Sequence, residues 1–202
     1  CVLALERHGI KPADGEILVT GANGGVGGVA IALLSKLGYT VVASTGRPAE
    51  AEHLKALGAT DVIERGEISA PGKPLGKERW AGVIDTVGGP MLAEILKSVR
   101  YDGVVAAIGA AAGASFPGSV IPFILRGVTL AGIESVMQSY GQRLAAWDRL
   151  STLYSPAVYA AMVEEVSLEA LPALSKTMLE GGVAGRQGLS GEGHLVIFRD
   201  MR

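Results

Sequence analysis

Residues that form disulfides and metal sites are scarce in this sequence. Only one of the 202 residues is cysteine, and the three histidines are scattered along the chain as His8, His53 and His194. A single cysteine excludes an internal disulfide, and the histidines lack the spacing of metal ligands. We therefore expect no metal site.

Long apolar runs and strong net charge are also absent. No stretch of about 18 residues is apolar without charges or turn residues, and no positively charged leader precedes an apolar segment. The net charge is -2 and there is no basic run, so nothing indicates a nucleic-acid surface. We expect a cytoplasmic protein that binds neither a membrane nor a nucleic acid.

Few residues are aromatic, and glycine is abundant. Aromatic residues make up 5% of the chain, hydrophobic residues make up 49%, and 29 residues are glycine. This composition is typical of an Ala/Val/Gly-rich α/β protein, and the length allows one good-sized domain with an extension. The opening segment, CVLALERHGI, has no initiator methionine and enters directly on a helical pattern. We expect residues 1–9 to be the end of a truncated helix.

The chain is organised around the segment from Ile17 to Leu34, ILVTGANGGVGGVAIALL. A short apolar run predicts a buried strand, and the apolar spacing after the glycines predicts a helix. Glycines between a strand and a helix let the backbone amides approach a pyrophosphate, which the positive end of the helix dipole attracts. Two registers fit the dinucleotide-binding fingerprint, either Gly25, Gly27 and Ala30 or Ala22, Gly24 and Gly27.

The same residues also match the TGxxxGxG opening of short-chain dehydrogenases. That family needs a catalytic tyrosine with a lysine four residues later. None of the tyrosines meets this requirement, because the residues four positions after them are Ala43, Val105, Leu144, Val158 and Val163. The short-chain interpretation is therefore disfavoured.

Further short apolar runs predict five more strands, at 40–44, 61–64, 81–87, 103–108 and 128–133. We expect a polar loop over 66–79, a helix from Gly89 through Val99, and a short helical or extended piece at 122–127. Continuous apolar strands that alternate with helices indicate a parallel sheet covered on both faces. We predict a doubly wound α/β fold with six parallel strands in the order 3-2-1-4-5-6.

The remaining residues have a different character. We predict a dinucleotide-binding (Rossmann) domain over 10–137 and a helical C-terminal extension over 138–202. The extension would contain helical segments at 143–163 and 168–180, a stretch at 181–186, and a terminal strand, HLVIFRD, at 194–200.

The sequence resembles a known family, the zinc-free, quinone-oxidoreductase-like branch of the medium-chain dehydrogenases. Within this branch it resembles the NADPH-dependent acryloyl-CoA reductases. The resemblance covers about residues 1–150, and PLGKERWAG is its most distinctive part. It is carried by VTGANGGVGGVAIALLSKLGYTVVASTGR, HLKALGATDVIER, PGKPLGKERWAGVIDTVGG, PFILRGVTLAGIESVM and AAWDRL.

The resemblance implies reduction of the C=C bond of a short enoyl thioester by hydride from NADPH. Members of the family carry a β-rich substrate domain ahead of the residue that matches Cys1, so we expect the isolated chain to bind cofactor and turn over little. Alternatives are a quinone or enone reductase of the same fold and a non-catalytic NADP(H)-binding module. No catalytic residue is assigned, and Tyr101, Tyr140 and Asp85 are interpreted as structural.

We expect the cofactor to be bound by residues of the glycine turn, of the strand ends that follow it and of the later loops. They are Ala22, Asn23, Gly24, Gly25, Val26, Gly27, Ser44, Thr45, Gly46, Arg47, Arg65, Thr86, Ile108, Gly109, Ala110, Ile124 and Ser135.

The end of the second predicted strand indicates NADPH. An NAD-dependent protein usually has an acid about twenty residues after the glycines, but Ser44 occupies that position and no acid appears before Glu50. Ser44, Thr45 and the backbone at Gly46 could donate hydrogen bonds to a 2′-phosphate, and Arg47 could offer it a guanidinium fork. We also expect a homodimer that pairs through the sixth strand, because this strand is an uncovered apolar edge.

Overall fold

The structure is a computed structural model, and it describes residues 1–153, 156–160, 162–180, 182–183 and 185–189. These residues form two compact units, which divide between Tyr154 and Ser155. The boundary expected after residue 137 therefore lies inside the first unit. No helix in the described ranges is long and apolar enough to cross a membrane.

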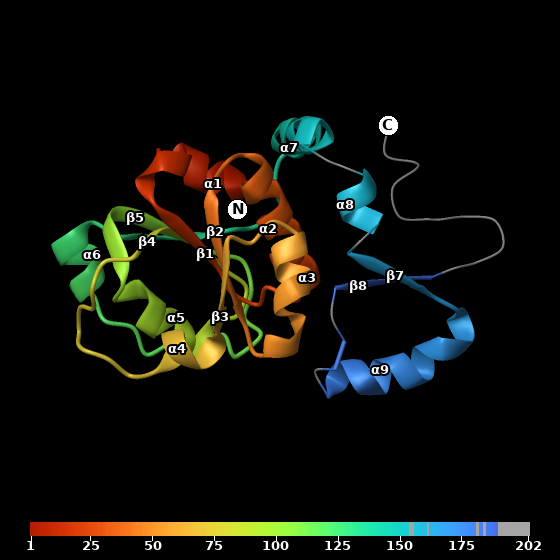
Figure 1. The fold of residues 1–202 in the computed structure, drawn as a ribbon. Coiled ribbons are helices and arrows are strands. Elements are labelled where there is room, and N and C mark those ends of the chain that lie inside the picture. Colours follow the sequence, from red (N-terminus) through yellow and green to blue (C-terminus); the bar gives the residue numbers. More distant parts are fainter. Residues whose placement is uncertain (154–155, 161, 181, 184, 190–202) are drawn as a thin grey trace. The chain divides into compact units, whose positions relative to one another are not determined.

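The first unit is an α/β unit with one six-stranded sheet (Figure 1). Its strands are β1 (Glu16–Val19), β2 (Thr40–Thr45), β3 (Asp61–Glu64), β4 (Trp80–Asp85), β5 (Val99–Ala107) and β6 (Thr129–Gly132). Its helices are α1 (Val2–Arg7), η1 (Pro12–Asp14), α2 (Gly25–Lys36), η2 (Pro48–Glu50), α3 (Ala51–Ala56), α4 (Arg65–Ser69), α5 (Gly89–Leu96), α6 (Ile121–Arg126) and α7 (Tyr140–Leu153).

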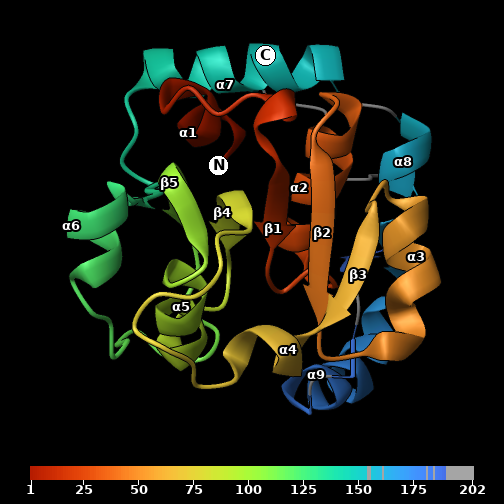
Figure 2. The ribbon, with the colours of Figure 1, turned by 60° about the vertical axis from the view of Figure 1, so that its left-hand side comes forward.

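The sheet has the predicted topology. The strand order is β3-β2-β1-β4-β5-β6 and every neighbouring pair is parallel. Figure 2 shows β3, β2, β1, β4 and β5 side by side in this order. The order reverses between β1 and β4, so the carboxyl ends of these two strands border the crevice where this fold binds ligands.

Helices cover both faces of the sheet, as predicted. On one face Leu18, Val42, Val83 and Val105 lie in register across the strands and form a core with α5, including its residue Ile95. On the other face α1 packs so closely over Gly82 that an added Cβ would lie 2.8 Å from Leu5 Cδ2. The continuous apolar strands thus bury side chains on both faces, which a parallel sheet requires.

Two predictions about connections were wrong. The helix expected to run through Val99 ends at Leu96, because Ser98 accepts hydrogen bonds from the N–H groups of Arg79 and Trp80 and Val99 begins β5 beside β4. The predicted loop over 66–79 begins with α4, whose start is capped by the bond from Glu64 N–H to the Glu67 carboxylate, 2.9 Å. The residues of this capping box are charged, and a run of charged residues was interpreted as a polar loop.

The second unit contains α8 (Pro156–Ala160), β7 (Val163–Val166), η3 (Leu168–Ala170), α9 (Leu171–Leu179) and β8 (Arg186–Leu189). β7 and β8 pair in parallel, with Val163 opposite Arg186. Neither strand was predicted, since Val163 was placed at the end of a helical segment. The predicted terminal strand at 194–200 lies outside the described residues.

Candidate functional site

The turn between β1 and α2 is shaped by glycines that no other residue could replace without strain. Gly21 has a φ of +58°, and its carbonyl accepts the N–H of Gly24 at 2.9 Å. A Cβ on Gly27 would lie 2.4 Å from Gly21 O, so the absence of a side chain lets α2 approach the turn. Gly24 at the N-cap of α2 provides no side-chain acceptor for the first N–H groups of the helix, and such groups favour an anion.

The end of β2 lies against this turn. Ala22 N–H donates to Ser44 O at 3.3 Å. The Thr45 hydroxyl donates to Asn23 Oδ1 and accepts the N–H of Arg47 at 2.9 Å. Ser44, Thr45 and Asn23 are all buried. Residues of the two segments expected to bind cofactor are therefore joined directly.

Arg65 is brought to the same place by the register of the sheet. Thr45 pairs with Glu64 at the ends of β2 and β3, so Gly46 and Arg65 follow as neighbours. A Cβ on Gly46 would lie 3.1 Å from the Arg65 guanidinium carbon. The Arg65 side chain is exposed, and within the described ranges it forms no ion pair with a carboxylate. This places a cation beside the strand end that would face the adenosine ribose.

A hydrogen-bond network joins the ends of β1 and β4 at the crevice. Thr20 Oγ1 donates to Asp85 Oδ1 at 2.7 Å and accepts Thr86 N–H at 3.0 Å, and Thr86 Oγ1 donates to Thr20 O at 3.0 Å. The buried Asp85 carboxylate also accepts the N–H of Val87 at 3.2 Å and of Gly88 at 2.9 Å. The adjacent threonines confirm the predicted reversal of strand order.

The turn after β5 completes this side of the crevice. Ile108 N–H and Gly109 N–H donate to Asp85 O at 2.9 and 3.3 Å. A Cβ on Gly109 would lie 2.3 Å from Thr86 O, so the two turns meet backbone to backbone. Ala110 follows and is exposed. Thr86, Ile108, Gly109 and Ala110 therefore lie together, and their contact with a cofactor stays a prediction.

Two other expected cofactor residues lie on later segments. Ile124 is on α6 and is 69% exposed, and its N–H donates to Val120 O. Ser135 follows β6, and its carbonyl accepts a bond of 3.4 Å from Arg143. No described contact joins either residue to the glycine turn, so their role is untested.

The sequence places Thr20 at the end of the first strand, where the crevice is expected, but it does not indicate that Asn23 and Thr45 form a hydrogen-bonded pair. Thr20 directly follows a buried strand and precedes the first glycine, which is a usable signal. The Asn23–Thr45 bond depends on tertiary structure and has no local signature. Tyr101 and Tyr140, interpreted as structural, are 67% and 80% exposed.

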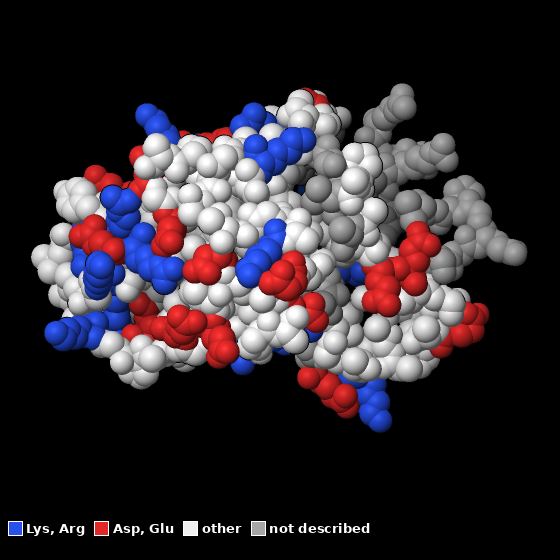
Figure 3. Space-filling view, in the orientation of Figure 1, with Lys and Arg blue, Asp and Glu red and all other residues white. Residues whose placement is uncertain are grey.

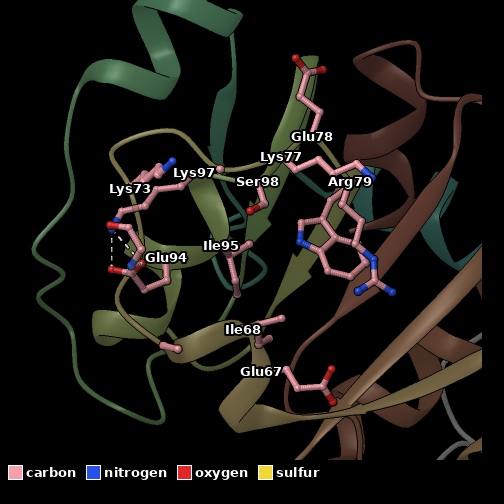
Figure 4. A pocket seen from close by; sticks show the side chains of 14 residues that line it. Glu67, Ile68, Lys73, Lys77, Glu78, Arg79, Glu94, Ile95, Lys97 and Ser98 are labelled. Atoms are coloured by element: carbon pink, nitrogen blue, oxygen red, sulfur yellow. Dashed lines mark hydrogen bonds and ion pairs between the residues drawn. The ribbon is translucent and has the colours of Figure 1, made fainter.

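A cavity in the first unit does not coincide with this crevice. It measures about 460 Å³ and lies where β4 and β5 begin, at the opposite ends of the strands. Figure 4 shows Lys73, Lys97 and Glu94 along one side of it and Glu67 at another. Lys97 and Glu94 are already paired at 2.6 Å, and Glu94 accepts Gly72 N–H at 3.0 Å. We place the functional site at the crevice, because glycine turns and strand ends converge there.

The described side chains provide neither a metal site nor, on the face shown in Figure 3, one continuous area of a single charge. No group of three or more His, Cys, Asp or Glu residues in the described ranges could hold a metal ion. In Figure 3, Lys and Arg side chains lie among Asp and Glu side chains on the visible face. Any ligand chemistry assigned to the crevice must therefore rest on its own amides, hydroxyls and arginines.

Comparisons with known proteins show which family and fold the chain shares. The chain is 51% identical to the acrylyl-CoA reductase AcuI of Ruegeria pomeroyi over 186 residues, which are 92% of the chain and 56% of that protein. The crystal structure of Escherichia coli K-12 YhdH with bound NADPH matches with a TM-score of 0.89 and 47% identity, covering 93% of this chain and 58% of that one. Bacillus subtilis YhfP with NAD bound matches with a TM-score of 0.86 and 45% identity, covering 92% and 57%.

The chain therefore spans little more than half the length of the relatives it matches. A family profile described as "Zinc-binding dehydrogenase" matches residues 25–151. This range begins at the first residue of α2 and holds Asp85 and the strands β2 to β6. Because the profile matches more than half of the chain, and because the chain is 51% identical to AcuI and has the fold of YhdH, it belongs to the zinc-binding dehydrogenase family.

Proposed function

We propose that this chain is the NADPH-binding part of an enoyl-thioester reductase. The observation that carries the proposal is the end of β2, where Arg47 and Arg65 flank Gly46 and no carboxylate takes the usual NAD position. A carboxylate there would repel a 2′-phosphate, whereas guanidinium groups bind phosphate by charge-assisted hydrogen bonds. The NADPH bound to YhdH supports the same choice.

The described residues suit a dinucleotide. The N–H groups at the start of α2 and the positive end of its dipole would hold the pyrophosphate. Arg47, Gly46 and Arg65 would hold the phosphorylated ribose, and the turns after β4 and β5 would border the nicotinamide. When bound, NADPH supplies a hydride to the β-carbon of the C=C bond. The chain's own part is to bind and orient, and no proton donor for the α-carbon is assigned.

The described residues do not suit zinc. Although the family name refers to zinc, no cluster of His, Cys, Asp or Glu in the described part of the chain could ligate it. We therefore derive no step through a metal.

The substrate class rests on similarity to AcuI, which reduces acrylyl-CoA according to its name. A quinone or enone reductase is the second candidate, because the chain is 46% identical over 184 residues to a putative quinone oxidoreductase, B. subtilis YhfP. A third candidate is an NADP(H)-binding module without catalysis of its own. Homodimer formation and a cytoplasmic location also remain proposals.

The test combines binding with turnover. Calorimetric titration of the 202-residue chain with NADPH is expected to show binding. NADPH oxidation, followed by the loss of its absorbance, is then measured with acryloyl-CoA, with a quinone and with no acceptor. We expect low rates from this chain, so the comparison between acceptors is what decides. A higher rate with acryloyl-CoA than with the quinone supports the proposal, the reverse order supports the second candidate, and binding without oxidation in either case is the outcome expected of the third. Failure to bind NADPH would exclude all three.

A further inference from the structure

Asn23, the only asparagine in the sequence, has a buried amide nitrogen with no hydrogen-bond acceptor among the described residues. The residue is 7% exposed and lies in the turn between β1 and α2. A buried donor without an acceptor is unfavourable, and native proteins contain few of them. Such a donor at the N-terminal side of a twelve-residue helix indicates a position where a ligand could supply the acceptor.

Thr45 fixes the orientation of this amide. Its Oγ1 accepts Arg47 N–H at 2.9 Å and donates its proton to Asn23 Oδ1. The Asn23 side chain is thus oriented with Oδ1 bonded to Thr45 at the end of β2. Its Nδ2 has both protons left to donate. Because a hydroxyl has a single proton, Thr45 cannot also donate to a cofactor while this bond exists.

We propose that Asn23 Nδ2 is a specificity-determining donor for the 2′-phosphate of NADPH, and that Thr45 is a positioning residue that acts through Asn23. The inference rests on the proposed function. Asn23 lies where the glycine turn meets the end of β2, which is the side of this fold that faces the adenosine ribose. Gly24 beside it is exposed and has no side chain, so a phosphate oxygen can approach the turn next to Asn23.

This arrangement distinguishes NADPH from NADH by the 2′-phosphate, which only NADPH has. A phosphate oxygen is a strong acceptor, so NADPH would satisfy Nδ2. NADH has no 2′-phosphate, so the donor stays unpaired when NADH binds. Because the donor is already buried and unpaired before any cofactor binds, NADH neither gains nor loses a bond at this position. The preference for NADPH comes from the charge-assisted bond that only its phosphate can accept.

The first test is Asn23→Leu, which keeps the approximate size and removes the donor. We expect the Kd for NADPH to rise about ten- to a hundredfold and the Kd for NADH to change less than about twofold. A residue with only a structural role would not change the NADPH-to-NADH ratio.

The second test is Thr45→Val, which removes only the hydroxyl that orients Asn23. We expect about two- to tenfold weaker NADPH binding and no further loss when the change is added to Asn23→Leu, since both act through one group. Thr60→Val is the matched control, because its hydroxyl bonds Val41 N–H at 3.3 Å where β2 begins. It should leave both affinities unchanged.

The outcomes separate the two proposals. Binding of NADPH by the wild-type chain, with equal losses for NADPH and NADH in Asn23→Leu, would overturn the role of Asn23 and leave the proposed function standing. Additive effects of the two substitutions would overturn the role of Thr45. A wild-type chain that binds neither dinucleotide would overturn the proposed function itself.

Discussion

Arg65 and Arg47 carry the expected preference for NADPH at the level of single residues. Arg65 lies over Gly46, and Arg47 follows it along the chain. We expect Arg65→Ala and Arg47→Ala each to weaken NADPH binding about ten- to a hundredfold, because a charge-assisted hydrogen bond is lost. NADH binding should be nearly unchanged. Calorimetric titration of both cofactors measures this.

The control is Arg7→Ala, since Arg7 is exposed on α1 and its Nε donates to Leu3 O at 3.2 Å. It should bind both cofactors like the wild type. If an arginine substitution weakens NADPH and NADH equally, that arginine does not contact the 2′-phosphate.

The sequence indicated Arg47 more readily than Arg65. Arg47 follows the second strand directly, so its position at the ribose end needs only the strand assignment. Arg65 is placed there by the pairing of Thr45 with Glu64, a register that no local pattern reveals. Only the family resemblance pointed to it.

Two adjacent glycines of α2 allow a sharp test at the level of one element. A Cβ on Gly27 would lie 2.4 Å from Gly21 O, whereas a Cβ on Gly28 would meet Leu57 Cδ1 at 3.4 Å. We expect Gly27→Ala to lower the free energy of unfolding by about 1–3 kcal/mol through overpacking. Gly28→Ala should raise it by up to about 1 kcal/mol through higher helix propensity.

Urea unfolding of both variants measures this difference. The pair is its own control, because the two residues differ only in what their side chains would meet. A loss of similar size in both variants would mean that the close approach of α2 to Gly21 is not the cause.

The turn that follows β4 depends on the Asp85 carboxylate. Asp85 accepts bonds from Thr20 Oγ1, Val87 N–H and Gly88 N–H. In Asp85→Asn an NH₂ group must face one of these donors, so we expect a loss of about 1–3 kcal/mol in the free energy of unfolding. Chemical denaturation measures it. Asp61→Asn, at an exposed site, is the control and should stay within about 0.5 kcal/mol of the wild type.

Elements of the doubly wound core were predictable, but those that depend on distant partners were not. β1, β2 and β4 are short apolar runs with glycine or polar turns beside them, and these signals are local. β7 and β8 have few apolar residues, with the partly polar sequences VEEV and RQGL, and become strands only by pairing with each other. The Asp85 network likewise joins residues 65 positions apart, which no sequence window contains.

The edge of the sheet bears on assembly of the whole molecule. β6 is the last strand in the order, and beside it in sequence α6 exposes Ile124 and Leu125. Unpaired edges and exposed apolar side chains favour association with a second copy. We expect light scattering at micromolar concentration to give about twice the monomer mass of 20.7 kDa.

Ala131→Lys, which adds a charge to β6, should yield a monomer if pairing occurs there. Lys36→Ala on α2 is a control that should keep the wild-type mass. A wild-type chain that scatters as a monomer, or a dimer that survives Ala131→Lys, would rule out pairing through this strand.

The meeting of β1 with β4 also has a consequence for how the chain folds. β1–β3 and β4–β6 each pair within their own half of the sheet, and only the β1–β4 ladder joins the two halves. Contacts between residues so far apart cost loop-closure entropy and form slowly. A dinucleotide that spans this junction binds only after the halves have met, and at a hundred times its Kd it would stabilise the joined state by about 2.7 kcal/mol. Bound cofactor would thus slow the separation of β1 from β4 and would have little effect on the rate at which these strands first pair.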